Sequence, residues 1–314
     1  MFEIKKMMWL YGLTSAHVGS GDNLSYVDLP IQRETHTGFP KIEASSLKGS
    51  IRQVMEQKET KDPNGPYPLT SKLLGSLKDG EVASAVSISD ARILFFPVKS
   101  AKGVFAWVTS PMAMRRFYQD CRLVDFKNLA QSLEKIDFKM QKVRRCTESA
   151  LLIDNESQIL LEEYDFKPEV CSDFENLLDL ITEYFPNEEP LLNKAEFKKR
   201  VVMVSDDDFR YFVTQSTEVT TRIKVNSKTG IVEKGALFTE EYLPPESILY
   251  SLMFISNERV KASEGGLLAS CIETKMNELL VDKLLQIGGN RTHGKGLFSI
   301  SIRKEEEKND STIK

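Results

Sequence analysis

Hydrophobic and polar residues alternate along several short segments of this chain, and alternation with a period of two predicts β-strands. An apolar run at residues 4–13 predicts the first strand. Further strands are predicted at residues 85–98, 104–108, 149–161, 201–204, 248–255 and 297–302. Residues 217–225 and 231–238 also alternate, and the turn sequence Asn-Ser-Lys-Thr-Gly between them predicts a β-hairpin.

Apolar residues spaced three and four positions apart predict helices in five other segments. These predicted helices begin near residues 46, 111, 172, 206 and 267. We expect the last to be the longest, running to residue 285, with Gly288 and Gly289 as its C-terminal cap. On the first helix, Lys48 and Arg52 lie four residues apart and therefore share one face.

The order of these elements predicts the fold class. Several strands are separated only by turns, and the chain lacks the even strand–helix rhythm of a parallel sheet, so we expect an α+β fold with an antiparallel sheet. The order fits a ferredoxin-like sheet with insertions. We expect a single domain over residues 1–314, with a surface loop at residues 59–80, an acidic and partly helical insertion at residues 151–190, and a disordered tail at residues 304–314.

The composition is that of a globular protein, with 41% hydrophobic and 28% charged residues among 314. No run approaches the ~20 apolar residues that a membrane span needs. The short apolar run near the N-terminus lacks the features of a signal peptide, so we expect a cytoplasmic protein with no membrane partner. The net charge of −4 is unevenly spread, because residues 151–190 carry −11 and the rest of the chain carries +7. A nucleic-acid partner is therefore compatible with the charge.

Two local motifs have more than one interpretation. The glycine-rich loop at residues 289–296 begins like a P-loop, but Gly296 stands where a P-loop needs Ser or Thr to bind magnesium. We therefore exclude a nucleotide-hydrolysing P-loop and expect either a phosphate-binding loop or a plain surface turn. Three consecutive carboxylates, at residues 206–208, either favour a helix N-terminus or contribute to a metal site.

Several segments taken together form a more specific pattern. They read LYGLTSAHVGSG at residues 10–21, VDLPIQRE at 27–34, HTGFP at 36–40, SSLKGSIR at 45–52 and IGGNRTHGKGL at 287–297. This pattern closely resembles the RAMP superfamily of CRISPR proteins. Within that superfamily, VSDDDF at residues 204–209 and EEYLPP at 240–245 are similar to the backbone subunit of the Cmr module of type III-B effectors.

The resemblance implies an architecture and a set of partners. It implies an RRM-like palm with a β-hairpin thumb at residues 215–240, and copies of the chain that stack into a helical filament along a CRISPR guide RNA. Other Cmr-module subunits would complete the complex. It also implies an endoribonuclease that cuts complementary single-stranded target RNA at regular intervals, with Mg²⁺ or Mn²⁺ as a divalent metal bound together with the target.

The resemblance also implies roles for individual residues. Asp28 stands at the catalytic aspartate position and is the expected metal ligand, while His17, Glu240 and Tyr242 match positions that line the same cleavage site. The helix with Lys48 and Arg52 matches the guide-contacting helix. Further candidate RNA-binding residues are Ser46, Arg33, Arg222, Gly288, Gly289, Arg291, Thr292, Gly294 and Lys295.

The chemistry of these residue types agrees with RNA cleavage by the neighbouring 2′-hydroxyl. Such cleavage needs activation of the hydroxyl and stabilisation of the phosphorane. A loop carboxylate such as Asp28 can hold a hydrated metal or position the hydroxyl, and His17 can donate a proton. Two alternatives stay open from the sequence. One is an RNA-binding filament subunit without catalysis, and the other is a metal-independent guide-processing endoribonuclease that uses His17 as general base.

Overall fold

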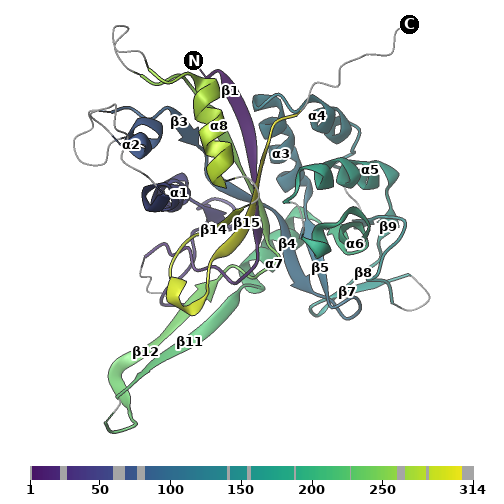
Figure 1. Ribbon diagram of the computed structural model, residues 1–314. Helices are drawn as coiled ribbons and strands as arrows, with labels where there is room; N and C mark the ends of the chain where they lie inside the picture. The colour runs from purple at the N-terminus through teal and green to yellow at the C-terminus, as the bar shows by residue number, and fades with distance from the viewer. Residues whose placement is uncertain are drawn as a thin grey trace, which may run out of the picture.

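The computed structural model describes residues 2–21, 27–58, 68–75, 82–139, 142–153, 157–186, 189–226, 228–259, 266–280 and 283–305. Its main feature is a mixed α/β body built on one 11-stranded sheet that is mostly antiparallel. Helices pack on both faces of this sheet, and a long β-hairpin projects from one end of the body (Figure 1).

The strands of the large sheet come from the whole length of the chain. In spatial order the main path is β14 (Lys283–Gln286), β15 (Leu297–Arg303), β1 (Ile4–Gly12), β13 (Ile248–Ile255), β4 (Ala91–Lys99), β5 (Phe105–Thr109), β10 (Val201–Met203), β6 (Arg144–Arg145) and β9 (Glu169–Val170). Off this path, β2 (Lys41–Ile42) pairs with β4, and β3 (Val86–Ile88) pairs with β13. The pairs β5–β10 and β6–β9 are parallel.

Strand β1 explains why the first apolar run of the sequence is continuous rather than alternating. It pairs antiparallel with both β13 and β15, so it lies inside the sheet. Successive side chains point to opposite faces of a strand. Met8 and Leu10 accordingly pack in the core on one face, whereas Met7 and Trp9 pack in the core on the other. Both faces are covered, so the consecutive positions from Met7 to Leu10 are all apolar.

The helices fall into two layers, one on each side of the sheet. On one side lie α1 (Ala44–Lys58), α2 (Leu69–Leu74), α7 (Asp206–Gln215) and α8 (Ala269–Leu280). On the other side lie α3 (Pro111–Leu123), α4 (Lys127–Glu134), α5 (Ser172–Ile181) and α6 (Lys194–Lys198). Three short 3₁₀ turns are η1 (Thr182–Tyr184), η2 (Pro190–Leu192) and η3 (Arg291–His293). Within the ranges that the structure describes, no helix is long and apolar enough to cross a membrane.

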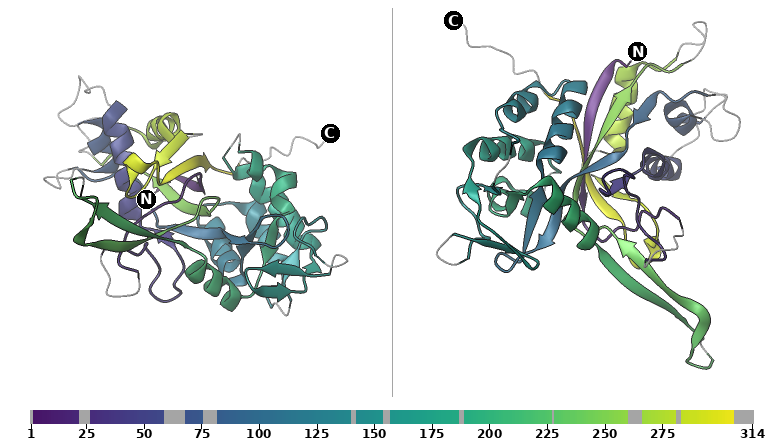
Figure 2. Two further views of the ribbon diagram at one scale, coloured as in Figure 1. Left: turned by 90° about the horizontal axis from the view of Figure 1, so that it is seen from below. Right: turned by 180° about the vertical axis from the view of Figure 1, so that it is seen from behind.

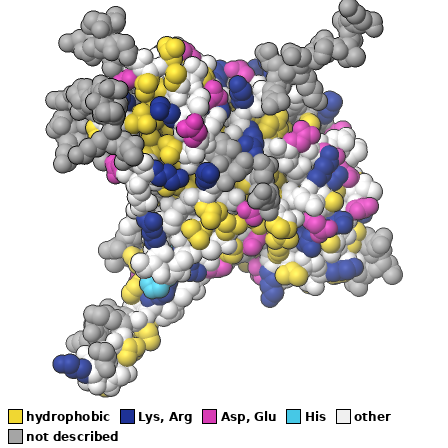
Figure 3. Space-filling view, viewed as in Figure 1, with side chains coloured by type: hydrophobic (Ala, Val, Ile, Leu, Met, Phe, Trp, Pro, Cys, Tyr) yellow, Lys and Arg dark blue, Asp and Glu magenta, His cyan; other side chains and the backbone are white. Residues whose placement is uncertain are grey.

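Among the described residues, two β-hairpins stand outside the large sheet. The small one consists of β7 (Ile159–Leu161) and β8 (Tyr164–Phe166). The long one consists of β11 (Glu218–Val225) and β12 (Val232–Tyr242), and it extends away from the body, as the right-hand view of Figure 2 shows. Apolar side chains such as Ile223 and Leu237 are 55% and 65% exposed on it. Figure 3 shows hydrophobic surface along this hairpin. A hairpin that exposes this much apolar surface is typical of a binding element.

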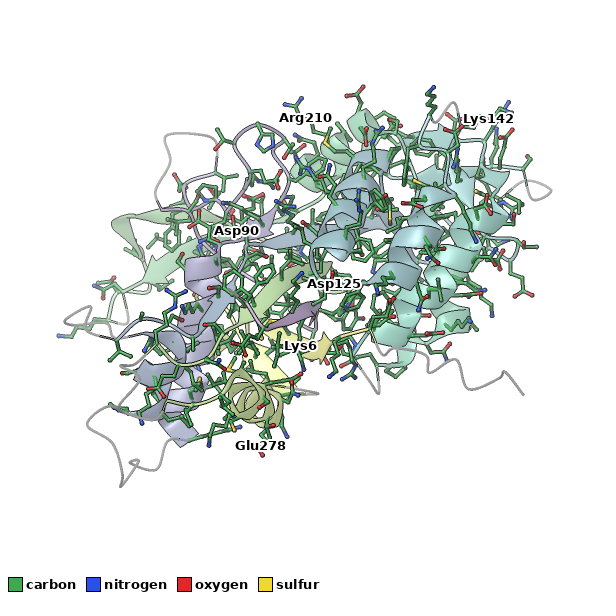
Figure 4. All side chains as sticks on the ribbon, turned by 90° about the horizontal axis from the view of Figure 1, so that it is seen from above. Lys6, Asp90, Asp125, Lys142, Arg210 and Glu278 are labelled. Atoms are coloured by element: carbon green, nitrogen blue, oxygen red, sulfur yellow. The ribbon has the colours of Figure 1, made fainter. Side chains whose placement is uncertain are left out.

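Charged side chains fix helices α1 and α8 against the sheet (Figure 4). The Asp90 carboxylate accepts a 2.8 Å hydrogen bond from the Ala44 backbone N–H at the start of α1 and pairs with Lys41 at 3.0 Å. On β1, the buried Lys6 pairs with Glu273 of α8 at 2.7 Å. A carboxylate at a helix N-terminus satisfies donors that have no partner within the helix. These contacts set the position of α1, which carries several of the candidate RNA-binding residues.

The structure differs from the sequence-based expectations at three elements. The last long helix ends at Leu280, and β14 follows it, because Leu285 and Ile287 are buried beside β15 rather than on a helix face. Within the expected surface loop at 59–80, helix α2 is packed into the core, while 59–67 and 76–80 lie outside the described residues. Of the expected tail, only 304–305 is described. Strand β12 also continues past residue 240 to Tyr242.

Candidate active site

Three of the four predicted catalytic side chains meet at the base of the long hairpin. His17 follows β1, and Glu240 and Tyr242 lie two residues apart on β12, so their side chains share one face of that strand. The Tyr242 hydroxyl donates a 2.6 Å hydrogen bond to Glu240 Oε2. His17 Nε2 lies 3.6 Å from Glu240 Oε1, and its ring packs edge-on against the Tyr242 ring at 5.7 Å. The sequence-based grouping of these three residues is therefore reproduced by the fold.

Residues from two other elements complete this cluster. Arg222 of β11 donates to Tyr242 Oη at 2.5 Å and to Glu240 Oε2 at 3.3 Å. Asn290 of the glycine-rich loop donates to Glu240 Oε1 at 2.5 Å and to Tyr242 Oη at 3.0 Å. The Lys295 ammonium lies over the Tyr242 ring, 4.8 Å from its centroid. The cluster thus joins the N-terminal, central and C-terminal parts of the chain.

The glycine-rich loop holds His17 in place by close backbone contact. The Gly289 N–H donates a 2.8 Å hydrogen bond to the His17 carbonyl. Gly288 has φ +88°, and a Cβ at this position would lie 2.3 Å from the same carbonyl oxygen. On the other side, His17 Nδ1 lies 2.7 Å from the Glu241 carbonyl, which can only accept, so Nδ1 carries the proton. The Nε2 atom of His17 consequently faces Glu240 and is available to exchange a proton.

Charge and burial act in opposite directions on Glu240. Burial raises the pKa of the Glu240 carboxyl, but hydrogen bonds from Tyr242 and Asn290, together with the charges of His17 and Arg222, outweigh it and leave the pKa below its ordinary value. Burial and the adjacent Glu240 carboxylate raise the pKa of the Tyr242 hydroxyl. At neutral pH the pair therefore consists of an ionised glutamate and a neutral tyrosine that donates to it.

The lowered pKa of Glu240 predicts a pH dependence of stability. A carboxyl whose pKa is lower in the folded chain stabilises the fold above its unfolded pKa, and this contribution is lost as the pH falls through the folded pKa. We expect the free energy of unfolding of the wild type to decrease below about pH 4.5 more steeply than that of Glu240→Gln. Urea unfolding between pH 3 and pH 6 measures the difference. Equal pH dependence in the two proteins would contradict the prediction.

Asp28 lies beside this cluster but contacts a different face of β12. Its Oδ2 accepts from the Thr239 backbone N–H at 2.7 Å and from the Thr239 hydroxyl at 2.9 Å. These two hydrogen bonds lower the pKa of the exposed Asp28 carboxyl. Because Thr239 and Glu240 are neighbours on a strand, their side chains point to opposite faces. Asp28 is therefore held next to the Glu240–Tyr242 pair without a hydrogen bond to it in the part of the chain that the structure describes.

At the candidate site, the described residues offer a single exposed carboxylate as a metal ligand, not a complete metal site. They contain no group of three His, Cys, Asp or Glu side chains placed to hold an ion. The carboxylates of Asp206 and Asp208 instead make contacts at the start of helix α7: Asp206 accepts from the Met112 N–H at 2.7 Å, and Asp208 Oδ2 accepts from the Ser205 hydroxyl at 2.6 Å. Asp28 supplies one exposed carboxylate. Mg²⁺ is commonly bound by one or two carboxylates together with substrate phosphates, so Asp28 fits a metal that arrives with RNA.

The two basic residues predicted on α1 have different environments. Arg52 is buried, and its guanidinium donates to the carbonyls of Leu74 and Gly75 at 3.0 and 2.8 Å, where α2 ends. Lys48 is half-buried and donates to Ser84 Oγ at 2.8 Å. Burial and the nearby Arg52 charge lower the pKa of Lys48. Arg52 thus joins α1 to α2, whereas the Lys48 ammonium stays closer to solvent.

These environments predict different consequences of substitution. Arg52→Met removes two hydrogen bonds to buried carbonyls, so we expect it to lower the free energy of unfolding by about 1–3 kcal/mol. Lys48→Met is expected to change stability little and to weaken RNA binding, reducing the slope of log affinity against log salt by about one. Thermal unfolding measures the expected stability loss of Arg52→Met, and RNA titrations at several salt concentrations measure the expected binding loss of Lys48→Met. A stability loss at Lys48→Met equal to that at Arg52→Met would contradict the distinction.

The other predicted RNA-binding residues also include some that bond within the protein and some that are exposed. Arg33 bonds inside the protein, to Gly38 O at 2.8 Å, to Val213 O at 2.9 Å and to Glu241 Oε1 at 2.5 Å. Ser46 Oγ accepts a 3.0 Å hydrogen bond from Gln32. By contrast, five loop residues are exposed: Gly288, Gly289, Arg291, Thr292 and Gly294. The exposed part of the glycine-rich loop is therefore better placed for a phosphate backbone than Arg33 is.

Three residues of the site were missing from the sequence-based set: Asn290, Thr239 and Glu241. The carboxylate of Glu241 is buried and accepts from the Ile31 N–H at 3.0 Å and from Thr217 at 2.7 Å, in addition to Arg33. Each missed residue is adjacent in sequence to a chosen one or lies inside the glycine-rich motif. Adjacency on a strand and membership of the motif were the signals that could have found them.

The family model of the RAMP superfamily matches residues 9–299. The chain belongs to the RAMP superfamily. A curated RAMP relative, the CRISPR system Cmr endoribonuclease Cmr4 of Pyrococcus furiosus, is 37% identical over 300 residues, which cover 95% of each chain. The CRISPR system CMR subunit Cmr4 of Saccharolobus solfataricus is 26% identical over 311 residues, 94% of this chain and 95% of that one.

Solved structures agree with this assignment of the RAMP fold. The crystal structure of oligomeric Cmr4 from Pyrococcus furiosus matches with a TM-score of 0.71 at 30% identity, over 96% of this chain and 99% of that one. A chain in the cryo-EM structure of the type III-B Cmr-β complex bound to cognate target RNA has a TM-score of 0.71 at 21% identity, over 96% and 98% of the chains. The second match concerns the fold alone.

Proposed function

We propose that this RAMP protein is an endoribonuclease and a repeating backbone subunit of a type III-B RNA-guided complex that acts in the cytoplasm. Its substrate is target RNA complementary to the CRISPR guide RNA, and its protein partners are further copies of itself and the other Cmr subunits. The observation that carries the proposal is 37% identity over 95% of the chain to the Cmr endoribonuclease Cmr4, together with the clustered His17, Glu240 and Tyr242 beside Asp28. The guide-processing alternative has no comparable support.

The arrangement of elements suggests how the chain engages RNA. We interpret the strands β15-β1-β13-β4, with α1 and α8 connecting them in the chain, as a ferredoxin-like palm, since this is the antiparallel strand order of a split βαβ unit. The β11–β12 hairpin is then the thumb. Its exposed apolar side chains would replace stacking contacts if it separated neighbouring base pairs, a change that costs a few kcal/mol per step.

The guide RNA would be held through its phosphates. Arg291 and Thr292 are exposed on the glycine-rich loop, and Lys48 stands on α1. Phosphate contacts position a nucleic acid without reading its sequence. A subunit that must accept any guide needs contacts of this kind, because base pairing between guide and target supplies the sequence specificity.

The residues at the base of the hairpin can have different roles in strand cleavage. Asp28 would position or deprotonate the 2′-hydroxyl, and His17 Nε2 would exchange a proton with the leaving oxygen. Arg222 and Lys295, which contact Tyr242 in this cluster, would supply positive charge to stabilise the negative charge that develops on the phosphorane. Asp28 is the residue that would hold Mg²⁺ or Mn²⁺ together with a target phosphate, and the ion would supply additional charge stabilisation. Glu240 and Tyr242 fix the orientation of this set.

A cleavage assay on the assembled complex tests the proposal. The complex is reconstituted with guide RNA and incubated with end-labelled complementary RNA, with a non-complementary RNA of equal length as the control. We expect a ladder of regularly spaced products from the complementary RNA only, lost in EDTA and restored by Mg²⁺ or Mn²⁺. Target RNA that is bound but stays intact under all conditions would overturn the catalytic role and leave a scaffold.

A further inference from the structure

The segment that carries Asp28 is docked on strand β12 of the hairpin. The Leu29 N–H donates to the Thr239 carbonyl at 3.0 Å, and the Glu241 N–H donates to the Leu29 carbonyl at 3.0 Å. Leu29 thereby forms a parallel bridge to Glu240. Beyond it, the Ile31 N–H donates to the buried Glu241 carboxylate at 3.0 Å. Asp28 is therefore not simply a loop residue, because its own backbone is attached to the base of the hairpin.

Thr239 makes the contacts that orient the Asp28 side chain. Its hydroxyl donates to Asp28 Oδ2 at 2.9 Å and accepts from the Asp28 N–H at 3.0 Å, while its backbone N–H donates to the same Oδ2 at 2.7 Å. Both hydrogen bonds that Thr239 donates to the Asp28 carboxylate go to Oδ2. Asp28 is exposed, so its carboxylate is open to solvent and to any bound RNA, and the two hydrogen bonds from Thr239 restrain its rotation.

We propose that Thr239 is a positioning residue for RNA cleavage, which fixes the Asp28 carboxylate in one orientation through its side-chain hydroxyl. The proposal rests on the proposed function, because it requires Asp28 to act in cleavage. The Thr239 hydroxyl accepts a hydrogen bond from the Asp28 backbone N–H and donates one to the Asp28 carboxylate. A β-branched side chain that lacks the hydroxyl therefore cannot replace threonine at this position. Serine retains both hydrogen bonds, and valine retains the shape of threonine but neither bond.

Hydroxyl removal at a neighbouring position provides a matched control. Thr221 of β11 lies directly opposite Thr239 in the hairpin and is exposed. Thr221→Val makes the same chemical change on the same hairpin, across from Asp28 and without a contact to it in the described residues. It therefore controls for changes in strand propensity and in hairpin stability, both of which respond to valine.

The test is single-turnover cleavage of target RNA by complexes that contain the wild type, Thr239→Val, Thr239→Ser or Thr221→Val. We expect Thr239→Val to lower the rate constant about 10- to 100-fold, because small displacements of a reacting group cost up to about 100-fold. The target-binding Kd should stay within about twofold, since Thr239 acts through Asp28. Thr239→Ser and Thr221→Val should cleave at rates within about threefold of the wild type.

Two further measurements separate positioning from a general structural role. Combining Thr239→Val with Asp28→Asn should give no slower cleavage than Asp28→Asn alone, because the two residues act as one unit. In the chain without RNA, hydrogen exchange at the Leu29 and Asp28 amides should be about fivefold faster in Thr239→Val, as expected for loss of a hydrogen bond that holds a local segment. This second readout does not depend on activity.

The outcomes distinguish this proposal from the proposed function. If the wild-type complex binds target and does not cut it, the proposed function fails. If the wild type cuts and Asp28→Asn does not, but Thr239→Val cuts at the wild-type rate, only the positioning role is overturned. Equally slow cleavage by Thr239→Ser and Thr239→Val would also overturn it, since serine keeps the hydroxyl.

Discussion

Replacing Asp28 by asparagine is expected to slow target-RNA cleavage by about 100- to 10,000-fold, the range that a positioned acid, base or ligand contributes. The exposed carboxylate is held against Thr239 at the base of the hairpin, and its hydrogen bonds with Thr239 lower its pKa, so it is ionised at neutral pH. Asparagine has nearly the same shape but no charge. Single-turnover cleavage by complexes assembled with the variant measures the loss.

The matched control for this variant is Asp207→Asn. Asp207 is an exposed carboxylate in the first turn of α7, within the three consecutive aspartates that were the alternative metal site in the sequence. We expect Asp207→Asn to cleave like the wild type, and Asp28→Asn to bind guide and target RNA with unchanged affinity. Normal cleavage by Asp28→Asn would contradict the assignment of Asp28. A comparable loss at Asp207→Asn would move the catalytic carboxylate to α7.

Gly288→Ala is expected to cause a large loss of stability, because the added methyl group would meet the backbone of His17. The residue has φ +88°, and an added Cβ would lie 2.3 Å from the His17 carbonyl oxygen, which is backbone and cannot rotate away. Left-handed backbone alone costs roughly 1–2 kcal/mol for alanine. With the contact added, we expect a total loss of about 3 kcal/mol or more and a Tm lower by about 5–10 °C.

Gly294→Ala separates the two contributions. Gly294 belongs to the same loop, has φ +71°, and would place its Cβ in open space. This control variant is therefore expected to lose only the conformational part, about 1 kcal/mol. Thermal unfolding of both variants in the absence of RNA measures the difference. Equal Tm values for the two variants would show that the loop moves away from His17 at no cost.

The elements predicted from the sequence were most accurate where the hydrophobic pattern was long and regular. The pattern around Trp9 indicated a buried strand, and β1 is the strand inside the sheet. A helix was predicted to begin near residue 206, and α7 begins there, with the Ser205 hydroxyl accepting from the Asp208 N–H as its N-cap. The prediction was wrong at Leu285, because an apolar residue at helical spacing fits the buried face of a strand equally well, and only pairing with β15 decides between them.

At the candidate site, too, some residues could be assigned from the sequence, whereas others could be assigned only from the fold. Residue types and the motif pattern selected His17, Asp28, Glu240 and Tyr242, because charged and polar groups with a chemical role stand out against a globular composition. The sequence could not assign Arg33 or Arg52, since a guanidinium looks identical whether it faces RNA or a buried carbonyl. The fold places both inside the protein.

The sequence alone predicted an α+β globular protein with an antiparallel sheet, and its motifs identified the RAMP superfamily and the side chains that could act in catalysis or RNA binding. Period-two patterns and glycine-rich turns are local, so they can be read without knowing which segments meet. Only the tertiary structure decided that a loop about 270 residues from His17 holds that histidine in place, and that Thr239 holds Asp28. Contacts between segments so far apart depend on packing of the whole sheet, which no local pattern encodes.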